Sequence, residues 1–140
     1  MLDAFLVPEK TVLTAKGDSE PLDISAASNP VFLMTLSVTS VVEQESIEVS
    51  VFTSADGTTW DAKAAAALPQ KFYVGEYPLL VDLSAAAGPK FIRAHWEVSR
   101  WGRGSTTPKF EIGLRFREVS RESLAEAQAE AQSRREHGGL

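Results

Sequence analysis

Two stretches near the C-terminal end of the chain alternate apolar and polar residues with a period of two. The apolar positions are Ile92, Ala94, Trp96 and Val98 in the first stretch, and Phe110, Ile112, Leu114 and Phe116 in the second. Successive side chains of a strand point to opposite faces, so 90–99 and 109–118 are each predicted to be a half-buried antiparallel strand. We expect the two strands to be neighbours in one sheet, with their apolar faces on a core shared with earlier strands.

Further strands are predicted along most of the chain. They fall at 4–7, 11–15, 20–24, 31–39, 45–53 and 78–83, with shorter ones at 59–62 and 70–74. Residues typical of turns separate them, and no long helical pattern lies between them. Eight or more short strands at this spacing predict an all-β fold, an antiparallel, jelly-roll-like β-sandwich. The alanine-rich stretch 62–67 is expected to be a loop or a short helical turn.

The C-terminal segment has a different composition. Residues 121–137 are rich in Ala, Glu, Gln and Arg, and Ser123 precedes Glu126 at the spacing of a capping box. A C-terminal α-helix is therefore predicted, which divides the chain into a sandwich domain at 1–118 and a helical tail at 119–140. Leu124 is the only large apolar residue of this helix, so we expect a projecting or loosely docked helix, better suited to contacting another subunit than to building the core.

Charge is distributed unevenly along the 140 residues, whose formal net charge is −5. Residues 1–89 carry 12 acidic and 4 basic side chains, whereas 90–117 carry 7 basic and 2 acidic ones. A basic strand pair on an acidic body, with Arg93 as a candidate contact residue, could bind an anionic partner, including another copy of the chain. Alternatively, cross-strand neighbours such as Arg93 and Glu97 only solvate an exposed face.

Several function classes lack support in the sequence. The chain has no cysteine and only two histidines, His95 and His137, and it contains no nucleophile elbow, phosphate loop or dinucleotide fingerprint. We therefore expect neither an enzyme nor a bound metal or cofactor. The basic strands have no aromatic residues on their polar faces, so nucleic acid is not an expected partner. The absence of a signal peptide and of a long apolar stretch predicts a cytoplasmic or virion protein without a membrane partner.

The stretch 51–60 contains the most recognisable motif. In Ser54-Ala55-Asp56-Gly57-Thr58-Thr59-Trp60, Asp-Gly supplies the positive φ of a tight hairpin turn, and Trp60 can fold back onto the preceding strand. This Ser-x-Asp-Gly-x-x-Trp pattern resembles the hairpin of discoidin-like and carbohydrate-binding-module jelly rolls, and of bacteriophage β-sandwich proteins. The resemblance implies a fold and carries no binding site to this chain.

The loop 100–108 is the main candidate for a recognition surface. Arg100, Trp101 and Arg103 are of the types enriched at interface hot spots, and glycines flank Arg103. In the alternative interpretation, Trp101 packs over the open end of the sandwich as a lid.

A second candidate surface consists of apolar residues that fall out of phase with the core. Leu33, Phe52 and Phe91 are expected to point outward, where another element or another subunit would cover them. These features favour a non-enzymatic structural subunit that forms a homo-oligomer or decorates a larger protein assembly. The alternative is a carbohydrate-binding module whose stacking platforms are drawn from Trp60, Tyr73, Tyr77 and Trp101.

Overall fold

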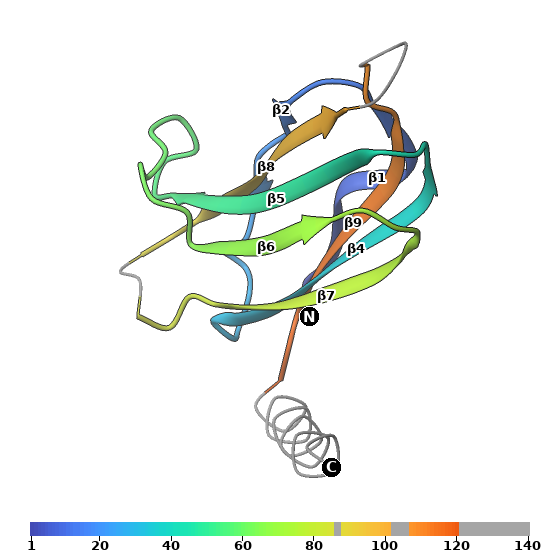
Figure 1. Ribbon diagram of the computed structural model, residues 1–140. Helices are drawn as coiled ribbons and strands as arrows, with labels where there is room; N and C mark the ends of the chain where they lie inside the picture. Colours follow the sequence, from blue (N-terminus) through green and yellow to red (C-terminus); the bar gives the residue numbers. More distant parts are fainter. Residues whose placement is uncertain (86–87, 102–106, 121–140) are drawn as a thin grey trace, which may run out of the picture.

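The computed structural model describes residues 1–85, 88–101 and 107–120, and in this part the chain forms two antiparallel sheets (Figure 1). The strands are β1 (Asp3–Leu13), β2 (Gly17–Asp18), β3 (Leu22–Asp23), β4 (Val31–Val41), β5 (Glu45–Ser54), β6 (Ala66–Lys71), β7 (Gly75–Asp82), β8 (Phe91–Arg100) and β9 (Phe110–Glu118). The first sheet has the order β1-β9-β4-β7, and the second has β2-β8-β5-β6, with β3 also paired to β8. The predicted all-β, two-sheet architecture is confirmed.

The described part contains no helix, and hence none that could cross a membrane. The predicted C-terminal helix at 121–137 lies outside the described residues.

Strand pairing is nested along the sequence. The first strand pairs with the last, β2 and β3 pair with β8, β4 pairs with β7, and β5 pairs with β6. A single long hairpin that is folded over and rolled up has this order of pairing. As a consequence, almost every contact within a sheet joins residues that are far apart in the sequence.

The nesting overturns one expectation, because β8 and β9 are not neighbours. β9 lies between β1 and β4 in the first sheet, whereas β8 lies between β5 and the short strands β2 and β3 in the second. The chain crosses from one sheet to the other between Arg100 and Phe110. The polar faces of these two basic strands therefore look outward from different sheets, and they form no single basic strand pair.

The alternation itself is confirmed. All four apolar positions of β9 are fully buried, as are Ile92 and Ala94 of β8. Trp96 is partly buried against the core, and its indole N–H donates to the carbonyl of Ala15 at 3.1 Å. On the inner face of the first sheet, the rings of Phe32 on β4 and Phe116 on the neighbouring β9 stack with centroids 4.7 Å apart and planes 18° apart.

Three local predictions differ from the structure. The predicted strands 4–7 and 11–15 form one strand, β1, whose register shifts near Lys10, a residue with φ of 62°. No strand forms at 59–62. The alanine-rich stretch continues into a strand, β6, because Leu68 pairs with Val49 and is buried in the core.

The edges of both sheets are poorly suited to pairing with another strand. Of the edge strands, β1 contains Pro8, β6 contains Pro69 and β7 contains Pro78, while β2 and β3 have only two residues each. Proline cannot donate a backbone hydrogen bond, and very short edge strands offer little to pair with. Contacts with another molecule are therefore favoured at the faces and ends of the sandwich over its edges.

Candidate functional site

Large apolar side chains gather at one end of the sandwich. We call Phe72, Tyr73, Val74 and Trp101 the aromatic end; they are 38%, 75%, 59% and 47% exposed, respectively. Three of them lie in the turn between β6 and β7, and Trp101 directly follows β8 (Figure 1, right). Together with residues 41–45, the three aromatic side chains line a hollow of about 330 Å³. The predicted recognition residue Trp101 thus lies half-exposed beside other aromatic rings.

The backbone beneath the aromatic end is held in place by hydrogen bonds. The amide of Trp101 donates to the carbonyl of Gln44 at 2.8 Å, and the hydroxyl of Tyr77 donates to the carbonyl of Tyr73 at 2.6 Å. The buried carboxylate of Glu45 accepts hydrogen bonds from the amides of Val42 and Lys109, at 2.9 and 2.7 Å. The exposed side chains therefore project from a fixed scaffold.

Arg100 helps to fix the same end. Its guanidinium donates to the carbonyls of Glu43 and Thr107, each at 3.4 Å, and so connects the β4–β5 turn to the segment that leads into β9. The ring of Phe72 stands edge-on to Trp101, with centroids 6.1 Å apart and an interplanar angle of 82°. Such edge-to-face pairs orient aromatic rings relative to each other. Arg103, the third predicted residue of this loop, lies outside the described residues.

The residues predicted on the outer face of the second sheet are covered by their own chain. The guanidinium of Arg93 lies 4.5 Å from the centre of the Trp60 ring. The ring of Phe91 packs so closely against Gly57 that a Cβ atom there would lie 3.3 Å from it. Phe52 stands edge-on to His95, with ring centroids 6.4 Å apart. The 54–60 segment therefore packs over Arg93 and over Phe91, the latter of which the sequence predicted to be covered by another element or another subunit.

The Asp-Gly motif in that segment acts as a structural turn. Gly57 has φ of 82°, as the sequence predicted. The carboxylate of Asp56 accepts hydrogen bonds from the amides of Thr59 and Thr58, at 2.8 and 2.9 Å. These bonds, with one from Ser54, lower the pKa of Asp56 far below its ordinary value. The carboxylate is thus engaged in holding the turn.

His95 lies on the same face between two carboxylates. Its Nδ1 atom is 2.9 Å from Asp18, and its Nε2 atom is 3.1 Å from Glu97. Burial lowers the pKa of His95, but the hydrogen bonds to Glu97 and Asp18 together outweigh this effect and raise the pKa above 6.5. Both ring nitrogens are engaged, so the imidazole is poorly placed to act as a general base. Among the described residues no group of three acidic, His or Cys side chains could hold a metal ion.

The other predicted contact residues lie elsewhere. Leu33 is half-buried on the outer face of the first sheet, between Leu80 and Arg117 in register, and lines a hollow of about 430 Å³. Leu124 lies outside the described residues. The structure therefore does not bring the predicted contact residues together at one site.

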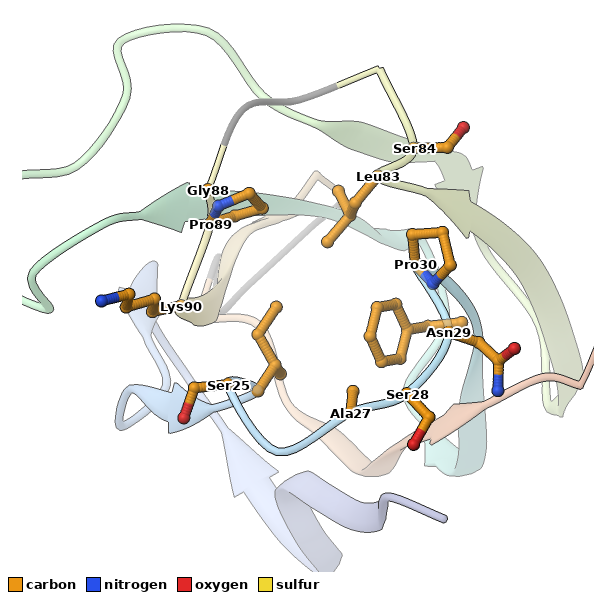
Figure 2. A pocket seen from close by; sticks show the side chains of 12 residues that line it. Ser25, Ala27, Ser28, Asn29, Pro30, Leu83, Ser84, Gly88, Pro89 and Lys90 are labelled. Carbon is orange, nitrogen blue, oxygen red and sulfur yellow. The ribbon is translucent and has the colours of Figure 1, made fainter.

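Another cavity, which the sequence did not predict, lies where β4 begins and β7 ends. This end pocket has a volume of about 450 Å³ (Figure 2). Its apolar lining residues are Ile24, Ala27, Pro30, Phe32, Leu83 and Pro89, and its polar ones are Ser25, Ser28, Asn29, Ser84 and Lys90. An Asp-apolar-Ser sequence occurs at 23–25 and again at 82–84, and this repeat could have indicated the pocket from the sequence.

No protein-family model matches the chain, and no curated protein matches it. The candidate sites are therefore interpreted from their own geometry.

Proposed function

We propose that the protein is a non-enzymatic structural subunit that associates with other copies, or with a larger particle, through its aromatic end. The observation that carries the proposal is the exposure of Phe72, Tyr73, Val74 and Trp101 on a backbone fixed by hydrogen bonds. Exposed apolar patches on folded domains mark interaction sites, and Trp and Tyr are enriched at binding hot spots. The carboxylate of Glu45 beneath the hollow accepts two backbone amides, which favours a structural role for this group over a catalytic one.

The architecture offers further support. With β2 and β3 counted as one interrupted strand, the nested pairing is compatible with the eight-strand plan of a jelly roll. Capsid and lectin domains use this plan, so it suits both a phage-type particle subunit and a sugar-binding domain. Because one fold serves many functions, the proposal rests on the aromatic end and not on this analogy.

Self-association should depend on the aromatic end. In sedimentation velocity, the wild-type chain is expected to form species larger than a monomer as its concentration rises. The double variant Tyr73→Ala/Trp101→Ala should weaken this association by at least about tenfold, because hot-spot truncations cost more than about 1 kcal/mol each. Phe5→Ala is the matched control, since Phe5 is an exposed aromatic residue, 45% exposed, on a different strand.

Two results would count against this proposal. One is a wild-type chain that stays monomeric at every concentration and salt level. The other is a double variant that associates as strongly as the wild type while the control behaves normally.

Carbohydrate binding is the second candidate, and one observation favours it. Of the four predicted stacking residues, Trp101 and Tyr73 line the same hollow together with the polar side chains of Glu43 and Gln44. The ring of Trp60 is covered by Arg93, and Lys71 lies 4.8 Å from the centre of the Tyr77 ring. A flat aromatic surface beside a few polar groups is suited to a sugar ring.

A glycan microarray tests this candidate. Binding of the wild-type chain to specific glycans, lost in Trp101→Ala and kept in Phe5→Ala, would support a sugar-binding site in the hollow. An array without hits, or equal binding by Trp101→Ala, would remove the candidate without affecting the test of self-association.

A further inference from the structure

The segments that form the aromatic end and the end pocket lie at opposite ends of β4 and β7, whose course can be followed in Figure 1. The end pocket includes Pro30 and Phe32, at the start of β4, whereas the hollow of the aromatic end includes Val41, the last residue of β4. β7 runs the other way, from the aromatic end to the pocket. One copy therefore presents exposed apolar side chains at one end and an apolar cavity at the other.

The end pocket is preformed by two similar turns. The carboxylate of Asp23 accepts hydrogen bonds from the amide and hydroxyl of Ser25, at 2.8 and 2.6 Å. Asp82 accepts the same pair from Ser84, at 2.9 and 2.6 Å. In each turn the middle residue, Ile24 or Leu83, is buried and lines the cavity. Because these turns fix the lining residues, filling the pocket needs little rearrangement.

The interior of the end pocket is apolar. Figure 2 shows Leu83 and Ala27 directed into the cavity, while the polar ends of Ser84, Asn29 and Lys90 are directed away from it. The volume of about 450 Å³ falls within the usual range of binding pockets, about 300–1,000 Å³. An aromatic ring with a neighbouring apolar side chain fits this size and chemistry.

Charged groups surround both ends. The exposed carboxylates of Asp23 and Asp82 lie beside the pocket, and the hydrogen bonds from Ser25 and Ser84 lower the pKa of each, so both stay ionised. The basic residues Lys71 and Arg100 directly adjoin Phe72 and Trp101 in the sequence. Charges of the opposite sign are present as well: the basic Lys90 lies at the pocket, and the acidic Glu43 and Glu76 lie at the aromatic end. Each end therefore carries charges of both signs, and the complementarity of the two ends rests on the exposed apolar side chains and the apolar cavity.

We propose that the aromatic end of one copy inserts into the end pocket of the next, in a head-to-tail contact between copies of this chain. This inference rests on the proposed function and identifies the partner surface. The contact is heterologous, so each pair keeps one unused aromatic end and one unused pocket. Repetition of the contact closes a ring or extends a filament.

A mixing experiment tests the pairing of unlike ends. Tyr73→Ala/Trp101→Ala removes the aromatic end and keeps the pocket, whereas Ala27→Phe fills the pocket and keeps the aromatic end. Each variant alone is expected to be monomeric in sedimentation velocity, and an equimolar mixture is expected to form a 1:1 dimer and nothing larger. Ala26→Phe is the matched control for the pocket variant, because Ala26 is exposed and does not line the cavity.

A cross-linking experiment covers the case in which Ala27→Phe fails to fold. The natural chain has no cysteine, so single cysteines can be placed at will. A mixture of Tyr73→Cys and Ala27→Cys, oxidised with copper phenanthroline, should form a mixed disulfide dimer. The mixture of Phe5→Cys and Ala27→Cys should form none.

The outcomes separate this inference from the proposed function. A monomeric wild-type chain contradicts both. A second outcome is that the wild type and Ala27→Phe associate equally while the aromatic-end variant does not. The aromatic end would then contact a surface of the next copy other than the end pocket. In that case the head-to-tail contact is wrong while the proposed function stands. A mixture that forms no dimer, together with no mixed disulfide, likewise overturns the head-to-tail contact alone.

Discussion

Replacing Phe116 with alanine is expected to lower the free energy of unfolding by about 3–5 kcal/mol. The side chain is fully buried in the core, and its ring stacks on that of Phe32 on the neighbouring strand β4, with ring centroids 4.7 Å apart. The variant loses the transfer free energy of the ring and leaves a cavity that the surrounding strands fill only in part. Since whole domains are stable by only about 5–15 kcal/mol, this loss is a large share of the total. Urea denaturation followed by circular dichroism measures it.

Phe5→Ala serves as the control for this measurement. Phe5 is 45% exposed on β1, next to β9 in the first sheet, so its truncation is expected to cost less than about 1 kcal/mol. Equal losses in the two variants would mean that the ring of Phe116 is not part of a packed core. If Phe116→Ala does not fold at all, Phe116→Leu retains part of the buried volume and should show a smaller loss in the same direction.

Replacing Glu118 with glutamine is expected to cost about 2–4 kcal/mol at neutral pH, because hydrogen bonds to a charged group contribute about 1.5–3 kcal/mol each. The carboxylate is buried and accepts hydrogen bonds from the amides of Leu2, Ser28 and Asn29, at 3.1, 3.2 and 3.0 Å. It also accepts one from the side-chain amide of Asn29 at 2.6 Å. Glutamine has one acceptor oxygen in place of two and turns a donor toward other donors.

This cost should depend on pH. The hydrogen bonds from Leu2, Asn29 and Ser28 hold the pKa of Glu118 below its ordinary value of 4.5 in the folded protein. A carboxyl group with a lowered folded pKa stabilises the protein above the unfolded pKa, and this contribution is lost as the pH falls through the folded pKa. The gap in stability between the wild type and Glu118→Gln should therefore stay constant from about pH 7 to about pH 5 and narrow as the pH falls below the ordinary pKa of 4.5.

Glu76→Gln is the matched control, because Glu76 is exposed on β7. Its stability should follow that of the wild type at each pH. A gap for Glu118→Gln that stays constant across the acid range would contradict the assignment of charge-assisted hydrogen bonds to this carboxylate.

The amino-acid pattern predicted the strands better than their arrangement. Alternation placed Phe110, Ile112, Leu114 and Phe116 correctly in the core because a period of two is a local property of each strand. The sheet to which β8 or β9 belongs depends on partners up to about a hundred residues away, and no local pattern encodes that choice. Only the last two residues of β6 fell within a predicted strand, 70–74, because its sequence, AALPQK, has neither clear alternation nor β-branched side chains.

Only some residues of the candidate sites could likewise be predicted from the sequence. Arg100 and Trp101 were predicted as recognition residues from residue type alone, and Tyr73 was considered only as a sugar-stacking platform. Phe72 and Val74 were missed, although three consecutive apolar residues before Gly75 were visible in the sequence. We expected a partner to contact three residues of the second sheet, Phe52, Phe91 and Arg93. In the structure the 54–60 segment covers Phe91 and Arg93, and Phe52 packs against His95. That cover depends on a loop path that the sequence does not specify.

The nested pairing also has a consequence during protein synthesis. β9 separates β1 from β4, so the first sheet cannot close before residues 110–118 have left the ribosome. Until then β4 has one side without a strand partner, and it is a long, largely apolar strand without proline. Long-range pairing is slow, and such an unpaired edge invites aggregation. The prolines protect only the edges of the completed sheets. Pairing of β9 with β4 is therefore the step that removes the aggregation-prone edge from the nascent chain.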